Sequence, residues 1–160
     1  MKTKIRLSVN EKDYEIEVEP HSTLLEVLRD HLKLKSVHRG CLEGECGVCT
    51  VMVNGEAVNS CLIFAVQADG EEITTLEGLM RDGDPHPLMK SFHENYGFQC
   101  GYCTSGFIMS AYSLLRSSEN PSREEISKSI EGNLCRCTGY MNIVKSIEAS
   151  IEKKRSGIWW

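Results

Sequence analysis

Eight cysteines in two groups of four constrain this chain of 160 residues more than any other feature. The first group is Cys41, Cys46, Cys49 and Cys61, and the second is Cys100, Cys103, Cys135 and Cys137. Cysteines grouped in this way form disulfides, or they hold zinc or an iron–sulfur cluster. Because four thiolates complete one site and no cysteine is left over, the pattern predicts two metal centres, one in each half of the chain.

The N-terminus and the hydropathy of the chain bear on which of these uses applies. Residues 1–13 contain no apolar stretch of the kind that a secretory signal peptide needs, and no apolar run is long enough to span a bilayer. We therefore expect a cytoplasmic protein without a membrane span. Structural disulfides are rare in that compartment, and grouped thiols there more often bind metal.

The charge of the chain is uneven. The formal net charge is −5; residues 1–83 hold 9 Lys or Arg against 15 Asp or Glu, and residues 84–160 hold 9 against 8. A surface that binds nucleic acid should be basic, so we expect no nucleic-acid partner. The acidic first half would steer a basic partner, and a merely solvating surface is the alternative.

The first half begins with the pattern of a β-hairpin. Residues 4–9 and 14–18 alternate apolar and polar side chains on either side of a turn at residues 10–13, which predicts two strands with one buried face. Thr23 and Glu26 then fit a capping box, in which each residue satisfies a free backbone amide of the other. We expect a short apolar helix to begin there.

A second hairpin follows the first cysteine loop. Residues 50–53 and 57–58 are its predicted strands, and Asn54-Gly55 is the pair that a two-residue type I′ turn prefers. Residues 73–76 are a plausible closing strand. Hairpin, helix, hairpin and strand make a small α+β domain, which we place at residues 1–78.

The second half is predicted to be four short helices with cysteines near their ends, at residues 84–157. Its helical segments are residues 88–96, residues 107–115, the segment after Ser122 and residues 143–151. Pro87 suits the first position of a helix, Gly97 suits a helix end, and Ser122 with Glu125 fits a second capping box. The tail Ile158-Trp159-Trp160 is either a disordered end or a surface that docks on a partner.

The spacing of the first cysteine group is typical of one kind of iron site. Cys41, Cys46 and Cys49 have the C-x4-C-x2-C spacing of a plant-type [2Fe–2S] centre, and Cys61 is the distant fourth ligand. Three thiolates within nine residues must curl round a compact cluster, which requires positive φ angles or close backbone approach. Gly40, Gly44 and Gly47 supply these. Zinc is the alternative, although it favours two separate C-x2-C pairs.

The second cysteine group is less specific. Cys100-x2-Cys103 and Cys135-x-Cys137 fit a zinc site as well as an iron–sulfur cluster on spacing alone. A Rieske centre needs two histidine ligands, and no histidine here stands at ligand spacing from a cysteine pair. The residues by themselves therefore leave zinc and iron open at this site.

Three motifs together resemble one protein family. They are Gly40-Cys-Leu-Glu-Gly-Glu-Cys-Gly-Val-Cys-Thr50, Gln99-Cys-Gly-Tyr-Cys-Thr-Ser-Gly106 and Glu131-Gly-Asn-Leu-Cys-Arg-Cys-Thr-Gly-Tyr140. Over nearly the whole chain, this pattern resembles the small iron–sulfur subunit of the molybdenum hydroxylases, the family of xanthine dehydrogenase, aldehyde oxidoreductase and carbon monoxide dehydrogenase. The resemblance implies a β-grasp ferredoxin domain followed by a four-helix domain, each with one [2Fe–2S] cluster, and so assigns the second group to iron.

The resemblance also implies partners. A large subunit would hold a molybdopterin, expected in its cytosine dinucleotide form, and a medium subunit would hold FAD, in a dimer of heterotrimers. Cys137 would then be the ligand nearest the pterin, and Gln99 would hydrogen-bond it; on spacing alone, Gln99 is a helix-start amide bonded to the backbone. Ser105 and Val48 depart from the family's usual proline and alanine.

These observations lead to an electron-transfer function. The chain has no pair of catalytic carboxylates, no nucleophile–base pair and no phosphate-binding loop, so we expect no catalytic residues of its own. The leading hypothesis is the electron-transfer subunit of a molybdenum hydroxylase, relaying electrons from the pterin site to FAD or another acceptor. A free-standing two-cluster carrier is the alternative, and a zinc-binding interaction module is a third hypothesis.

Overall fold

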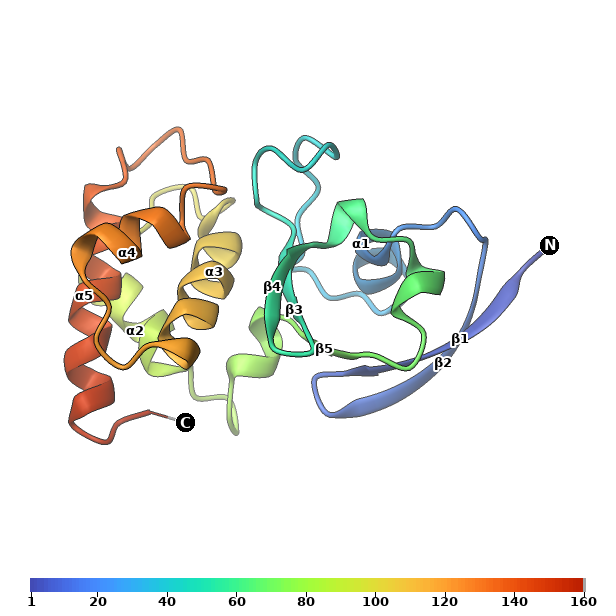
Figure 1. Cartoon of the computed structure of the whole chain (residues 1–160), viewed down its shortest axis with the longest axis horizontal. Helices are drawn as coiled ribbons and strands as arrows, with labels where there is room; N and C mark the ends of the chain where they lie inside the picture. Colours follow the sequence, from blue (N-terminus) through green and yellow to red (C-terminus); the bar gives the residue numbers. More distant parts are fainter. Residues whose placement is uncertain (160) are drawn as a thin grey trace.

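The chain folds into a mixed five-stranded sheet followed by a group of helices (Figure 1). The structure is a computed structural model, and it describes residues 1–159. The strands are β1 (Thr3–Val9), β2 (Lys12–Val18), β3 (Thr50–Val53), β4 (Glu56–Asn59) and β5 (Glu72–Thr74). The α-helices are α1 (Leu24–Glu26), α2 (Pro87–Glu94), α3 (Thr104–Ser117), α4 (Arg123–Ser129) and α5 (Met141–Arg155). Shorter helical turns are η1 (Val27–His31), η2 (Ser60–Leu62), η3 (Ala65–Ala68) and η4 (Leu76–Leu79).

The predicted first hairpin is confirmed, with a tighter turn than expected. β1 and β2 pair antiparallel from Thr3 opposite Val18 to Val9 opposite Lys12. Only Asn10 and Glu11 form the turn, because both adopt positive φ angles of 51° and 64°. Two such residues make a turn whose twist matches that of the strands. Pairing therefore includes Lys12 and Asp13, two residues of the expected turn.

The sheet has the order β2-β1-β5-β3-β4, and its central pair β1 and β5 is parallel, whereas the outer pairs are antiparallel. The predicted capping box at Thr23 and Glu26 is confirmed and begins α1, which continues into η1. Leu24, Leu25 and Leu28 of this helical segment are fully buried. Two hairpins around a parallel pair, with a helix packed against the sheet, form the β-grasp fold.

The closing strand is shorter than residues 73–76. It spans Glu72–Thr74, and the chain then enters η4. Asn10 is the cause, because its side chain accepts from the Thr75 amide at 2.9 Å and donates to the Thr75 hydroxyl at 3.0 Å. These bonds take the backbone of Thr75 out of the sheet ladder and turn the chain towards the helices.

The four predicted helices of the second half are confirmed as α2 to α5. Pro87 begins α2, and the capping box of Ser122 with Glu125 begins α4. Gly97 does not end α2 by a left-handed conformation, since Tyr96 takes that conformation with a φ angle of 56°. Gly97 is required for close approach instead: a Cβ there would lie 2.5 Å from the Ser146 hydroxyl.

Two hydrophobic cores lie on either side of the contact between β3 and α3. Ile5, Val51 and Ile73 belong to the core of the sheet. Met52 on β3 and Leu79 on η4 point the other way and join the core of the helices. Figure 1 shows β3 and β4 beside α3 at this contact. Because one strand contributes to both cores, the sheet and the helices are packed against each other.

The start of the C-terminal tail packs on the chain itself. The partly buried Trp159 ring meets the His86 ring edge-on at a centroid distance of 4.4 Å, and the Lys154 ammonium lies 5.8 Å from the Trp159 ring. Trp160, the other tryptophan of the predicted tail, lies outside the described residues. Among residues 1–159, no helix is both long and apolar enough to cross a membrane.

Candidate metal centres

Three backbone amides converge on the sulfur of Cys41. The amides of Glu43, Glu45 and Cys46 lie 3.5, 3.2 and 3.3 Å from this sulfur. The amide of Cys41 in turn donates to the Cys46 sulfur at 3.3 Å. These donors, that of Glu43 foremost, lower the pKa of Cys41 to about 7 because they stabilise the thiolate. The loop is therefore arranged to hold negative charge on sulfur.

The glycines of this loop do what the sequence predicts. Gly44 and Gly47 adopt φ angles of 85° and 67°, which L side chains rarely tolerate. Gly40 permits close approach, because a Cβ there would lie 2.6 Å from the Cys46 sulfur and 2.8 Å from Val48. The backbone thus wraps the thiols without side chains in between, which fits a compact cluster with four thiolate ligands.

Cys49 and Cys61 form a second, more buried pair in the first set. They are 3% and 8% exposed, and their thiols contact each other. Burial raises the pKa of Cys61 to about 11, and the neighbouring Cys49 thiol adds to the increase. The first set thus consists of two pairs, Cys41 with Cys46 and Cys49 with Cys61, as a two-iron cluster with two thiolates on each iron requires.

The second set is also paired. The sulfurs of Cys100 and Cys137 lie 3.7 Å apart, and the thiols of Cys103 and Cys135 contact each other. Burial raises the pKa of Cys103 to about 12. Burial acts in the same direction on Cys135, but the hydroxyl and amide of Thr138 outweigh it and lower the pKa of the Cys135 thiol. Both sets therefore offer two pairs of thiols.

Helix ends and loops bring the second set together. Cys103 stands directly before α3, and Cys135 and Cys137 lie in the loop from α4 to α5. Tyr140, with a φ angle of 69°, turns that loop into α5, and its hydroxyl accepts from the Cys135 amide at 3.0 Å. All the cysteine loops lie at the same end of the molecule, at the top of Figure 1. Within residues 1–159, no three Cys, His, Asp or Glu side chains are placed to hold a single metal ion.

Gln99 lies at the exposed edge of the second set. Its side-chain amide donates to the carbonyl of Cys137 at 3.1 Å. The residues alone predict a helix-start amide that bonds to the backbone. The bond to the backbone is present, but Gln99 does not start a helix, because α3 begins only at Thr104. Cys100 and Cys137 are exposed beside it, whereas Cys103 and Cys135 are more buried. One pair of the second set therefore faces outward.

The two cysteine loops touch through residues that sequence reasoning did not single out. Leu134 donates its amide to the carbonyl of Cys46 at 3.0 Å, and the Asn133 side chain donates to the carbonyl of Gly47, also at 3.0 Å. On the other side, Tyr102 donates its hydroxyl to the carbonyl of Arg39, and its ring lies 4.4 Å from that of His38. These residues lie in or beside the three motifs, but nothing in the sequence indicates that they contact residues so distant from them along the chain.

The two departures from the family pattern are both buried. Ser105, in the first turn of α3, is 5% exposed, and its hydroxyl has no hydrogen-bond partner among residues 1–159. Val48 is also 5% exposed and would contact a Cβ at position 40. Neither residue contributes a thiol, so both pairs of each set are complete without them.

Comparisons with known proteins agree with this geometry. Residues 7–80 match the family model of a 2Fe-2S iron-sulfur cluster binding domain, and residues 75–148 match that of a [2Fe-2S] binding domain. The small FeS subunit of nicotinate dehydrogenase from Eubacterium barkeri is 45% identical over 95% of this chain and 97% of its own length. The iron-sulfur-binding subunit of aldehyde oxidoreductase from Escherichia coli K12 is 42% identical over 90% of this chain and 69% of its own length.

Solved structures show the same fold. A chain of quinoline 2-oxidoreductase from Pseudomonas putida 86 superposes with a TM-score of 0.93 at 39% identity, over 98% of both chains. Aldehyde oxidoreductase from Desulfovibrio gigas superposes with a TM-score of 0.91 at 35% identity, over 97% of this chain and 17% of that longer one. On the strength of these identities and coverages, the chain belongs to the family of small [2Fe–2S] electron-transfer subunits of the molybdenum hydroxylases.

Proposed function

We propose that this chain relays electrons from a molybdenum–pterin site on a large partner subunit to FAD, or another acceptor, on a medium partner subunit. In this proposal, one [2Fe–2S] cluster is held by Cys41, Cys46, Cys49 and Cys61, and the other by Cys100, Cys103, Cys135 and Cys137. When bound, such clusters accept and release one electron at a time. The relatives support the proposal, because they are named as subunits of a dehydrogenase and an oxidoreductase.

The chain's own residues would hold and tune the clusters. The amides directed at Cys41 stabilise negative charge at the first set, and the Thr138 hydroxyl does so at Cys135 of the second. Burial of Cys49 and Cys61 keeps water from that side of the first site. The protein thus contributes ligands, hydrogen bonds and a partly dry surrounding, whereas substrate chemistry belongs to its partners.

One observation carries the proposal most directly. The loops of the two sets lie against each other, and the Leu134 amide bonds to the Cys46 carbonyl. Leu134 directly precedes Cys135 in the chain. A single hydrogen bond therefore links Cys46 of the first set to the residue next to Cys135 of the second set. A chain that holds two redox centres this close is suited to pass electrons between them.

The exposed side of the second set is where we place the large subunit. Cys137 would lie nearest the pterin, and Gln99, which already orients the Cys137 carbonyl, would contact it. Large exposed apolar side chains lie near the cysteines of the second set in the sequence, namely Tyr96, Phe98, Tyr102, Leu134, Tyr140 and Met141. Their burial under a larger subunit would remove them from water.

The surroundings of the first set suit the acceptor subunit. Leu42, Leu62 and Phe64 are about half exposed beside Cys41 and Cys61. Glu43 and Glu45 add negative charge to this surface, which would favour a partner with basic residues around an apolar patch. We therefore place the flavin-bearing subunit at this side.

The composition of the whole complex is part of the proposal. We infer a dimer of heterotrimers that carries the cytosine dinucleotide form of molybdopterin. We place the domains at residues 1–78 and 84–157, with residues 158–160 as a tail. We also place the complex in the cytoplasm, where reducing conditions keep such thiols from pairing as disulfides.

Purification of the native complex with metal analysis tests the proposal. We expect larger subunits to copurify, with four irons and four acid-labile sulfides for each copy of this chain and two distinct EPR signals after reduction. The two signals should differ because one set lies in a glycine-rich loop and the other at helix ends. Stoichiometric zinc, two irons per chain, or an active lone monomer would contradict it.

A further inference from the structure

We propose that Asn133 is a positioning residue for electron transfer between the two cysteine sets, acting through the carbonyl groups of Cys46 and Gly47. The inference rests on the proposed function, because it takes both sets as cluster ligands. The step concerned moves one electron: iron held by one set is oxidised, iron held by the other is reduced, and no bond forms or breaks.

Asn133 and its neighbour bind two consecutive carbonyls of the first cysteine loop. The Asn133 side-chain nitrogen lies 3.0 Å from the Gly47 oxygen, and the Leu134 backbone nitrogen lies 3.0 Å from the Cys46 oxygen. The second of these bonds completes a path of covalent bonds and one hydrogen bond from Cys46 to Cys135. The first bond fixes the adjacent peptide group, so it holds the Cys46 carbonyl in line with the Leu134 amide.

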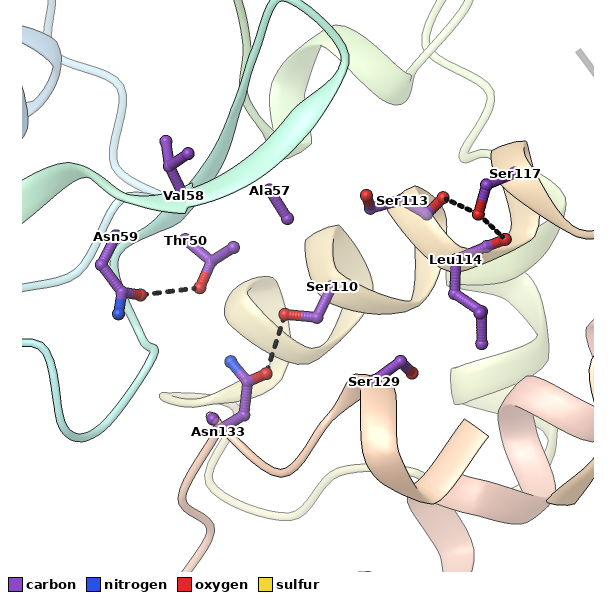
Figure 2. A pocket seen from close by; sticks show the side chains of 11 residues that line it. Thr50, Ala57, Val58, Asn59, Ser110, Ser113, Leu114, Ser117, Ser129 and Asn133 are labelled. Carbon is purple, nitrogen blue, oxygen red and sulfur yellow. Dashed lines mark hydrogen bonds between the residues drawn. The ribbon is translucent and has the colours of Figure 1, made fainter. Parts of the chain in front are cut away.

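The Asn133 amide is buried and oriented. The residue is 3% exposed, and its side-chain oxygen accepts from the Ser110 hydroxyl of α3 at 2.8 Å (Figure 2). The Gly47 carbonyl can only accept, so the amide turns its nitrogen towards Gly47 and its oxygen towards the Ser110 hydroxyl, which can donate. A buried polar group with both ends satisfied specifies one geometry more strongly than an exposed one.

The loop has no room to shift around this bond. A Cβ at Gly106 would lie 2.1 Å from the Gly47 oxygen, and a Cβ at Gly47 would lie 2.4 Å from the Asn133 side-chain nitrogen. The backbone of Gly47 is therefore enclosed between α3 and the loop that leads to Cys135. Because this region is closely packed, a change at Asn133 displaces the carbonyls of the first loop.

A matched pair of substitutions distinguishes the effect of the Asn133 contact from the effect of losing any side-chain hydrogen bond to the same loop. Asn133→Asp keeps the size of the side chain and an acceptor for Ser110, but it removes the donor and places a carboxylate against the Gly47 carbonyl. Asn59→Asp is the control. Asn59 makes the same kind of bond to the same loop, from its side-chain nitrogen to the Gly44 carbonyl at 3.0 Å, and its oxygen accepts from Thr50. It does so from β4, within the sheet half, and it lines the same pocket as Asn133 (Figure 2).

The experiment uses the purified complex with its partner subunits. Flash reduction by a photoexcited deazaflavin, followed by visible absorption, gives the rate at which the two clusters equilibrate, and EPR of the fully reduced protein gives their spin–spin splitting. In Asn133→Asp, we expect this rate to fall roughly tenfold and the splitting to change, since displacing groups by about 1 Å has effects of this order or larger. Iron and sulfide should stay at wild-type values. The control Asn59→Asp adds the same negative charge beside the same loop, and it should equilibrate at the wild-type rate.

Several results would overturn the inference. A wild-type rate and splitting in iron-replete Asn133→Asp would do so, and so would an equal slowing in Asn59→Asp. If Asn133→Asp fails to retain its clusters, Ser110→Ala decides, because it frees the amide of Asn133 but leaves the residue in place. A slower rate in Ser110→Ala supports the inference, and an unchanged rate overturns it. Wild-type protein without two clusters would instead refute the proposed function, before any variant is compared.

Discussion

The amide of Leu134 lies 3.0 Å from the carbonyl oxygen of Cys46, to which it donates a hydrogen bond. Cys46 belongs to the glycine-rich loop of the sheet half, and Leu134 directly precedes Cys135 in the helical half. The two cysteine loops are therefore part of the contact between the two halves, together with β3 and α3. Motion of one half against the other would have to break bonds at the proposed redox centres.

The direction of electron flow can be tested with two cysteine variants. In Cys46→Ser, the first set loses a ligand, so substrate should still reduce molybdenum and the remaining cluster while reduction of the flavin collapses. In Cys137→Ser, the disturbance lies at the exposed edge of the second set, so substrate electrons should reach neither the other cluster nor the flavin. Stopped-flow absorption and EPR measure these steps.

The cysteine variants need a control for assembly, because a lost ligand can also unfold its domain. Iron, molybdenum and flavin should therefore be quantified in each variant. Full turnover of a Cys46→Ser complex that retains its other cofactors would show that electrons do not pass through the first set.

The close approach of Gly106 to Gly47 predicts a sharp steric effect. A Cβ in Gly106→Ala would lie 2.1 Å from the Gly47 oxygen, so the sheet and the helices must separate locally. Overpacking of this kind costs about 1–3 kcal/mol. Gly132→Ala is the control, since a Cβ there meets no atom within 4 Å among the described residues and its φ angle is not positive. Thermal unfolding should distinguish the variants, and equal midpoints would contradict the prediction.

Glu77 should make stability depend on acid pH. Burial alone would raise the pKa of this carboxyl, but hydrogen bonds from the Ser36 hydroxyl, the Thr75 hydroxyl and the Ser36 amide outweigh it and hold the pKa below its usual value of 4.5. The carboxylate therefore stabilises the fold fully above pH 4.5, and this contribution is lost as the pH falls through the lower folded-state pKa.

Glu77→Gln tests this dependence. At neutral pH, the variant should lose about 1–3 kcal/mol, as expected for hydrogen bonds to a charged group. The difference from wild type should shrink as the pH falls below 4.5. Urea unfolding followed by circular dichroism measures both, with the exposed Glu17→Gln on β2 as the control. A difference that grows in acid would show that the sign is wrong.

Trp159 should contribute to the stability of the chain itself. Its ring packs edge-on against the buried His86 and near Lys154, so Trp159→Ala should lower the thermal midpoint by removing part of this cover. Removing a partly buried aromatic side chain costs about 1–3 kcal/mol. Ile158→Ala, at a side chain that is 54% exposed, should have little effect. Equal midpoints for both variants would indicate that the tail does not stabilise the isolated chain.

Much of the fold could be predicted because its determinants are local. The alternation in β1 and β2 follows from a two-residue period, and both capping boxes join residues three apart. The C-x4-C-x2-C loop is likewise a local feature, so the placement of amides around Cys41 was foreseeable from its glycines. The closing strand was predicted too long because of a distant side chain: Asn10 ends β5 early through Thr75.

The sequence by itself determined the two sets of thiols, the hairpins, the helix starts and the family, because each depends on residue types at short spacings. Only the tertiary structure decided how the two sets meet. The bond from Asn133 to Gly47 joins residues 86 positions apart, and Gly97 is needed because the chain passes close to Ser146. Such contacts depend on how the elements pack in space. The sequence around a short polar side chain or a glycine does not indicate which distant residue will lie against it in the folded chain.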